Sequence, residues 1–423
     1  MKNRTLFRSV LALCLLLLAT QGLFGYPIDG YKNTGIRRLL RLQSIIDGEI
    51  KATAPLKGQQ KSINDIRLHL LGGRGDSLAI LPEPDSALQA GVNALFRGLS
   101  RAYSVTVLDI TPGKPVRYAK RKEKLGYQPG SVGKLAVIAG LFCELESIYP
   151  DSFSKRQALM KRKIIKAGPW AIPNSHTVPF YDIDTKKFAK RILQAKDTFS
   201  LYEWADHMVS VSSNGAASVV WREAVLMRVF GQKYPELTQE EADEYFENTE
   251  KSELQKIAMS VVNEPLQAIG ISKEEWHLGS FFTRGAKARI PGVGGSTGSP
   301  LGLMKYLVAL ERGKITDEES SLEIKRLMYI TDRRIRYASS KIFTDAAVYF
   351  KSGSLYKCKE EEGYECKKYK GNVYNYMNSV AIVEHGDSTT YIVALMSNVL
   401  KKNSGSDHRY LASRIEKVIR KEE

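Results

Sequence analysis

The spacing of hydrophobic residues along the chain changes from a β-like pattern to a helical one and back again. Residues 103–110 (YSVTVLDI) are rich in β-branched and aromatic side chains, and a TPGK turn follows them. The region from about residue 135 to residue 340 is mainly helical in pattern, and it opens with the almost unbroken apolar run LAVIAGLFCEL. Three β-rich segments come next, in an order typical of successive hairpins: AAVYFKSGSLY, MNSVAIVEHGD and STTYIVALMSN.

Strands on both sides of a helical middle region indicate an α+β fold with two lobes. We expect the strands from both chain ends to join in one antiparallel sheet flanked by helices. Residues 135–340 are then expected to form an all-helical lobe, with a cleft where the two lobes meet. This reading places the main domain at residues 96–423. Residues 26–95 contain one short helical pattern and several turns, so we predict an N-terminal extension of unknown role.

The first 25 residues have the layout of a secretory signal peptide. Three basic residues precede an apolar run from Val10 to Ala19, and small residues follow up to Gly25. The run is shorter than the roughly 20 apolar residues that a membrane-spanning helix needs, and no later stretch approaches that length. We therefore predict an exported protein, periplasmic or secreted, with no membrane span once residues 1–25 are removed.

The composition is that of a globular protein, with 43% of the 423 residues hydrophobic and 26% charged. The formal net charge is +17, but the 63 lysines and arginines are scattered among 46 acidic residues, and no nucleic-acid-binding motif accompanies them. We therefore expect no nucleic-acid partner. The six histidines show no metal-ligand spacing with one another or with cysteine. We expect a monomer without a metal or an organic cofactor.

Two of the four cysteines are spaced for a disulfide. Cys14 lies in the predicted signal peptide and Cys143 in an apolar helical pattern, whereas Cys358 and Cys366 bracket the polar stretch KEEEGYE. Because an exported protein matures in an oxidising compartment, we predict that Cys358 and Cys366 close a disulfide across a hairpin.

The segment YQPGSVGKLAVIAG, residues 127–140, contains the first candidate for chemistry. Ser131 and Lys134 are three positions apart at the start of a predicted helix, so both side chains point the same way. A serine hydroxyl becomes a nucleophile when a neighbouring base takes its proton, and a helix N-terminus offers free N–H groups beside it. Taken alone, the pair also fits a helix-capping serine followed by a surface lysine.

Two further motifs follow in order along the chain. VSVSSNGAASVV places Ser212 and Asn214 between two helical patterns, and YFKSGSLY places Lys351 on a β-rich segment. The order SxxK, SxN and K[ST]G is typical of penicillin-recognising serine enzymes. From residue 100 to 420 the sequence therefore resembles class A β-lactamases and their low-molecular-weight penicillin-binding relatives. The resemblance implies the two-lobed β-lactamase/transpeptidase-like fold.

The resemblance also implies a role for each motif residue in acylation. Ser131 corresponds to the acylated nucleophile, and Lys134 to its base or proton relay. Ser212 corresponds to the hydroxyl that passes a proton to the leaving nitrogen, and Asn214 to the group that orients the substrate amide and Lys134. Lys351 corresponds to the cation that holds Ser212. A second positive charge near Lys134 disfavours its protonation, which suits a base.

The third motif implies substrate binding. Lys351 and Ser352 correspond to the residues that attract and hydrogen-bond a substrate carboxylate, and Gly353 completes the motif. The backbone N–H groups of Ser131 and Ser354 correspond to the oxyanion hole. The implied substrate is a small β-lactam or a peptidoglycan-like peptide.

The sequence departs from the class A pattern in two places. Ser213 stands where these enzymes usually carry an aspartate, and the stretch HLGSFFTRGAKARIPGVGGSTGSP contains no acidic residue, although a class A β-lactamase places its deacylating glutamate in this loop. Glu274 and Glu275, just upstream, fit the charges of a helix start. The deacylating base is therefore open. Without a positioned base, we expect the acyl-enzyme to form readily but to hydrolyse slowly. This favours a peptidase, a transpeptidase, an esterase-like hydrolase or a β-lactamase with another water-activating group.

The sequence offers three other interpretations. GGSTG at 294–298 matches a nucleophile elbow, but a glycine-rich loop precedes it where that motif requires a strand. PGSVGKL lacks the upstream glycine and the hydroxyl residue of a phosphate loop. The third alternative is a non-catalytic envelope protein that binds cell-wall peptides, and a fluorescent penicillin that labels Ser131 would exclude it. We predict a serine hydrolase that acylates Ser131.

Overall fold

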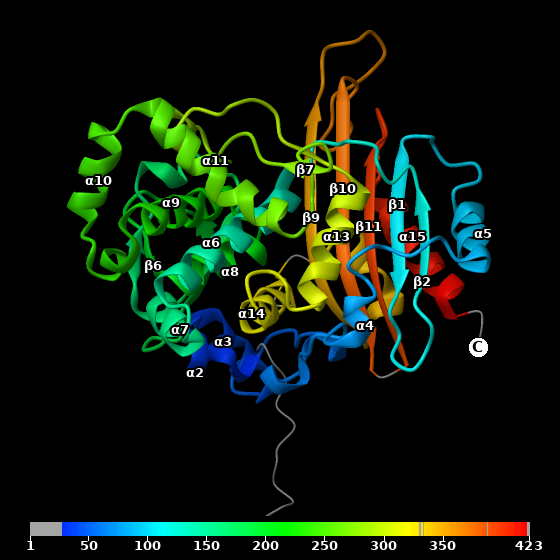
Figure 1. Ribbon diagram of the computed structural model, residues 1–423, viewed down its shortest axis with the longest axis horizontal. Coiled ribbons are helices and arrows are strands. Elements are labelled where there is room, and N and C mark those ends of the chain that lie inside the picture. The colour runs from blue at the N-terminus through cyan, green and yellow to red at the C-terminus, as the bar shows by residue number, and fades with distance from the viewer. Residues whose placement is uncertain (1–27, 330, 333, 387, 421–423) are drawn as a thin grey trace, which may run out of the picture.

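The chain folds into two lobes, a five-stranded sheet with its covering helices and a mainly helical lobe beside it (Figure 1). This computed structural model describes residues 28–329, 331–332, 334–386 and 388–420. The predicted signal peptide, with Cys14, lies outside the described residues. Within these ranges no helix combines the length and apolar character needed to cross a bilayer. The two-lobed α+β architecture predicted from the hydrophobic pattern is confirmed.

The sheet takes its strands from both ends of the chain, in the order β2-β1-β11-β10-β9, with every pair antiparallel. Val107 pairs with Val393, so the register joins a strand before the helical region to one after it. The strands are β1 (Tyr103–Asp109), β2 (Arg117–Arg121), β9 (Ala347–Lys357), β10 (Tyr374–His385) and β11 (Thr389–Asn398).

Alternation along the strands sorts their side chains between two hydrophobic cores. In β10, Val380 and Ile382 belong to the core shared with the helical lobe, whereas Ala381 and Val383 belong to the core on the outer face. The outer face is covered by α5 (Ser86–Leu95) and α15 (Gly405–Arg420), and the inner face by α13 (Pro300–Glu311) and α14 (Glu318–Tyr329).

Helix α6 (Lys134–Ile148) forms the centre of the helical lobe and packs against α9 (Asn214–Phe230) and α11 (Lys251–Ala268). Every residue from Lys134 to Phe142 is buried, which explains the breadth of its apolar run. The surrounding helices are α7 (Phe153–Arg162), α8 (Leu201–Val209), α10 (Gln239–Asn248) and α12 (Arg284–Arg289).

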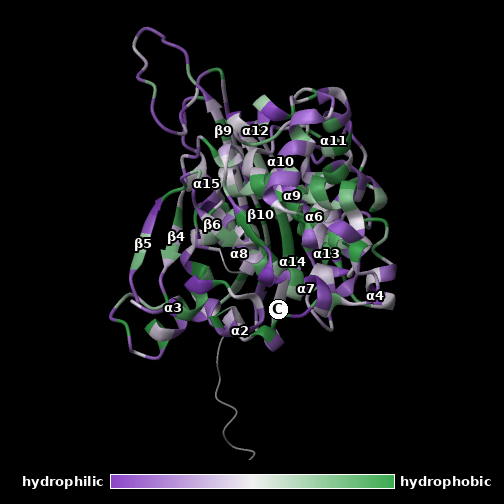
Figure 2. Ribbon diagram, turned by 90° about the vertical axis from the view of Figure 1, so that its left-hand side faces the viewer, coloured by the Kyte–Doolittle hydropathy of each residue, from purple (hydrophilic) through white to green (hydrophobic). Residues whose placement is uncertain are grey.

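The helical lobe also contains short strands that the all-helical prediction omitted. They form three pairs: β3 (Ile164–Lys166) with β6 (Thr198–Ser200), β4 (Thr177–Tyr181) with β5 (Phe188–Ile192), and β7 (Trp276–His277) with β8 (Thr297–Gly298). Figure 2 shows the mainly hydrophilic β5 on the outside of β4. Segments this short carry too few residues for a period of two to stand out in the sequence.

Residues 28–76, which precede α5, run along one edge of both lobes, below the helices and then toward the lower part of the sheet in the view of Figure 1. Helix α3 (Arg37–Ile46) docks on α8, where the buried Arg38 guanidinium donates two hydrogen bonds of 2.5 and 2.6 Å to Asp206. Further along, Lys61 Nζ lies 2.7 Å from the buried carboxylate of Glu384 in β10. The segment therefore contacts both lobes through buried charges.

Candidate active site

Ser131 lies in a single 3₁₀ turn, η4 (Gly130–Gly133), that leads directly into α6. Gly130 has a positive φ of 53°, and a Cβ added there would lie 2.8 Å from the backbone nitrogen of Ser354. The turn therefore requires glycine for both reasons. Lys134 begins α6, is fully buried, and donates a 2.8 Å hydrogen bond from Nζ to Ser131 Oγ.

The amine of Lys134 also contacts the second motif. It donates to the Ser212 carbonyl oxygen at 2.8 Å and to Asn214 Oδ1 at 2.7 Å, and it lies 3.4 Å from Ser212 Oγ. These contacts fix the position of Nζ beside Ser131. The structure thus brings the first two motifs together.

Ser212 lies between α8 and α9 in a left-handed conformation, with φ 63°. Such a conformation is uncommon for a residue with a Cβ and is found most often at functional sites. The next residue, Ser213, caps α9, because its Oγ accepts a 3.1 Å hydrogen bond from the Ala216 amide. Ser213, which stands where class A enzymes usually carry an aspartate, therefore stabilises the start of α9.

The third motif lies on β9 and reaches the same point. Buried Lys351 donates a 2.7 Å hydrogen bond from Nζ to Ser212 Oγ. A Cβ on Gly353 would lie 2.1 Å from the Pro129 carbonyl oxygen and 3.0 Å from the Ser131 amide nitrogen. Since only glycine permits this approach, β9 lies directly against the turn that carries Ser131.

One narrow pocket, with a volume of about 30 Å³, is lined by Ser131, Ser212 and the β9 residues 352–354. Four of its lining residues belong to no sequence motif: His176, Ile335, Arg336 and Tyr369. His176 Nδ1 hydrogen-bonds to the Ser212 carbonyl oxygen. Arg336 donates to the Gly353 carbonyl oxygen at 2.8 Å and to Ser354 Oγ at 3.0 Å. No spacing signal in the sequence identifies such single loop residues.

The segment that carries the deacylating glutamate in class A enzymes places apolar side chains beside η4. A Cβ on Gly133 would lie 2.7 Å from Leu278 Cδ2, and the ring centroid of Phe282 is 5.0 Å from Lys134 Nζ. Glu275 forms an ion pair with Lys305 at 2.6 Å. Among the described residues, the pocket lining includes neither Asp nor Glu.

Comparison with models of protein families identifies the family of this chain. The sequence model Beta-lactamase2, described as the β-lactamase enzyme family, matches residues 87–420. The chain belongs to the β-lactamase enzyme family. A search of the curated proteins returns no significant match.

Solved structures of the β-lactamase family share the fold at low sequence identity. The TLA-3 extended-spectrum β-lactamase is 14% identical, with 78% of this chain and 97% of that chain aligned and a TM-score of 0.52. A class A β-lactamase from Bacteroides cellulosilyticus is 13% identical, with 80% and 98% aligned and a TM-score of 0.51. PBP-A, captured as an acyl-enzyme with penicillin G, is 14% identical, with 79% and 97% aligned and a TM-score of 0.49.

Two further features of this β-lactamase-family chain concern its ligands and cysteines. Across the described part of the chain, no three His, Cys, Asp or Glu side chains come together as a metal site. Cys358 and Cys366 form a disulfide with a Cα–Cα distance of 5.9 Å at the end of β9. The Cys143 thiol is free, and burial raises its pKa to about 11.

Proposed function

We propose that the chain is an exported serine hydrolase that forms an acyl-enzyme on Ser131 with a β-lactam or a cell-wall-type peptide and hydrolyses it slowly. The observation that carries the proposal is the continuous path of contacts from Ser131 through Lys134 and Ser212 to Lys351. Acyl transfer to a hydroxyl needs a base beside that hydroxyl and a group that protonates the leaving nitrogen. The path supports both needs.

In the acylation step, the neutral amine of Lys134 takes the Ser131 proton while Oγ attacks the substrate carbonyl carbon. The developing oxyanion faces the N–H groups of Ser131 and Ser354, which adjoin because β9 lies against η4. The C–N bond then breaks as the Ser212 hydroxyl gives its proton to the nitrogen, and the proton held by Lys134 restores Ser212. An ester on Ser131 and a free amine result, without a cofactor.

The proposed carboxylate site lies on the β9 side of the pocket. Lys351 supplies a buried positive charge, and the hydroxyl of Ser352 lines the pocket beside it. Arg336, which sequence reasoning missed, adds a guanidinium next to Ser354. Guanidinium and ammonium groups in a half-buried pocket favour a ligand with a free carboxylate.

Slow hydrolysis follows from the apolar side chains next to the nucleophile. Deacylation needs a water held beside a base, whereas Leu278 and Phe282 lie on that side of η4. This arrangement favours a penicillin-binding peptidase over an efficient penicillinase.

Mass spectrometry of the intact protein over time with a penicillin tests the proposal. We expect an adduct that maps to Ser131, is absent in Ser131→Ala and persists for many minutes. Ser147→Ala, which removes an exposed hydroxyl from the same helix α6, should leave the adduct unchanged. A rapidly vanishing adduct would indicate a β-lactamase, and an adduct at another residue would contradict the assigned nucleophile.

The small volume of the pocket favours a second candidate, a non-catalytic envelope protein that binds cell-wall peptides. The two candidates separate in the same experiment. Complete absence of an adduct, together with saturable binding of an acyl-peptide ending in two alanines, would support the binding protein.

A further inference from the structure

The pocket at Ser131 is too small for the substrates that its residues suit. Its volume of about 30 Å³ is close to the share of one water molecule, whereas ligand pockets usually enclose roughly 300 to 1,000 Å³. Space is available elsewhere in the molecule, for example about 460 Å³ between α11 and the segment 293–295. The side chains that line this pocket therefore limit what can enter it.

Tyr369 is the lining residue that comes from the loop between β9 and β10. Its ring centroid lies 5.3 Å from the guanidinium carbon of Arg336 and 5.7 Å from the ring centroid of Tyr356, in an edge-to-face arrangement. The ring thus stands on the side of the pocket formed by Arg336 and Ser354, where the carboxylate-bearing part of a substrate is proposed to bind.

The backbone at this wall is held in conformations that cost energy. Tyr369 has φ 60°, and Arg336 has φ 52°; together with Ser212 they are three left-handed residues with side chains around one pocket. Strain of this kind persists only where surrounding contacts determine the conformation.

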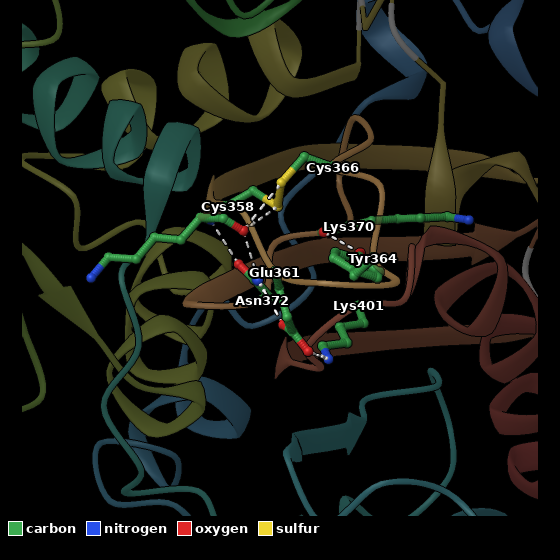
Figure 3. The surroundings of a disulfide bond; sticks show 8 residues. Cys358, Glu361, Tyr364, Cys366, Lys370, Asn372 and Lys401 are labelled. Carbon is green, nitrogen blue, oxygen red and sulfur yellow. Dashed lines mark hydrogen bonds and ion pairs between the residues drawn. A yellow bond between two sulfur atoms is a disulfide. The ribbon is translucent and has the colours of Figure 1, made fainter.

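Tyr369 belongs to the loop between β9 and β10, which a disulfide and several hydrogen bonds hold together (Figure 3). Cys358 and Cys366 close the loop on one side of Tyr369. On the other side, the Asn372 amide bonds to the backbone N–H and C=O of Lys359 at 2.8 and 2.9 Å. The Lys401 amide donates to the Gly371 carbonyl oxygen at 2.8 Å and so joins the loop base to the chain after β11.

We propose that Tyr369 is a specificity-determining residue that bars bulky groups from the Arg336 and Ser354 side of the pocket. Ser131 then accepts acyl donors whose carboxylate-bearing group is small, such as peptides that end in alanine or glycine. The role of Tyr369 in substrate selection rests on the proposed function. The steric barrier that its ring forms does not depend on whether the chain is catalytic.

The first test compares acylation rates for a bulky and a small acyl donor. Benzylpenicillin carries its carboxylate on a dimethyl-substituted ring, whereas an acyl ester of thioglycolate carries it on one methylene. In Tyr369→Ala we expect the second-order rate constant with benzylpenicillin to rise about tenfold and that with the thioester to stay within about twofold. Tyr369→Phe keeps the ring and should behave as the parent chain.

Two more variants separate the ring from the loop. Lys367→Ala changes an exposed residue of the same loop and should have no effect on either rate constant. The double variant Cys358→Ser, Cys366→Ser releases the loop and should raise the benzylpenicillin rate constant in the same direction as Tyr369→Ala. An unchanged or lower benzylpenicillin rate constant in Tyr369→Ala would overturn the proposal.

The second test measures access without catalysis. In a Ser131→Cys chain, the introduced thiol is alkylated by iodoacetamide, which is small, or by pyrenylmaleimide, which is bulky. Adding Tyr369→Ala should raise the rate ratio of pyrenylmaleimide to iodoacetamide about tenfold. An equal ratio in both chains would refute the steric role even if Ser131 is acylated. A raised ratio without any acylation of Ser131 would uphold it and reject the proposed function.

Discussion

Lys351 has a buried ammonium that donates a hydrogen bond to the hydroxyl of Ser212, a residue that lines the pocket. Lys351→Ala should lower the rate of penicillin labelling about 100- to 1,000-fold, because Ser212 loses the contact that holds its proton-relay position. Labelling by a fluorescent penicillin, followed on a gel, measures this rate. Lys187→Ala, an exposed lysine of the β4–β5 hairpin, is the control. Equal rates in the parent and Lys351→Ala would remove Lys351 from the mechanism.

Phe282 lies beside Lys134 on the side where deacylation would need a base. Phe282→Glu should shorten the lifetime of the penicillin adduct about tenfold, since a carboxylate there can hold and deprotonate a water. Phe282→Leu changes the ring without adding a base and should keep the adduct as long-lived as in the parent. Mass spectrometry after removal of free penicillin gives both lifetimes. A glutamate variant with an unchanged adduct lifetime would show that water access, not a missing base, limits hydrolysis.

At the residue scale, contacts within one motif are predictable from the sequence because each motif has a fixed local spacing. Ser131 and Lys134 lie one helical turn apart, so their contact is a local property. Arg336, His176 and Tyr369 could not be predicted, because their place at the pocket depends on loops that carry no periodic signal.

At the scale of elements, a buried ion pair joins α3 to α8, the helix that ends just before Ser212. Arg38→Gln should lower the free energy of unfolding by about 3 kcal/mol, because it leaves the fully buried Asp206 carboxylate without its charged partner. Arg37→Gln, whose partner Glu203 lies on the same helix, should cost under about 1 kcal/mol, because the Arg37 side chain is 37% exposed.

Urea unfolding monitored by circular dichroism measures both differences. The double variant Arg38→Met, Asp206→Leu should recover much of the lost stability, since it removes both buried charges together. Equal losses for the Arg37 and Arg38 variants would contradict the assignment of the buried pair as the stronger contact.

The strands of the sheet were predictable because each spans seven or more residues or follows a clear turn, as β1 and β9 do. The docking of α3 on α8 was not predictable from the sequence. Arg38 and Asp206 are 168 positions apart, and a contact of that separation leaves no trace in a single sequence.

At the scale of the whole molecule, two buried imidazoles govern how stability depends on pH. Burial lowers the pKa of His207 and of His408 to about 3, with Arg38 and Arg336 adding to the effect. The unfolded chain binds these protons near the ordinary pKa of histidine, so their contribution is complete above about pH 6.5 and is lost as the pH falls toward 3.

Between pH 6 and pH 5, each buried histidine should lower the free energy of unfolding by about 1.4 kcal/mol per pH unit. His408→Gln keeps a hydrogen-bonding group near Ser379 and Ser397 but removes one titrating imidazole. Its slope, from urea unfolding at several pH values, should therefore be shallower by that amount. Identical slopes in the two chains would contradict the neutral buried state of His408.

Lys61 and Glu384, which form an ion pair in the folded chain, are synthesised far apart in time. Lys61 precedes its partner by 323 positions, so the ribosome must finish almost the entire polypeptide before this ion pair can close. Until then the nascent chain lacks the contacts that complete its native state, and contacts so distant in sequence make folding slow. The ion pair between Lys61 and Glu384 therefore closes only after the strands that complete the sheet have been synthesised.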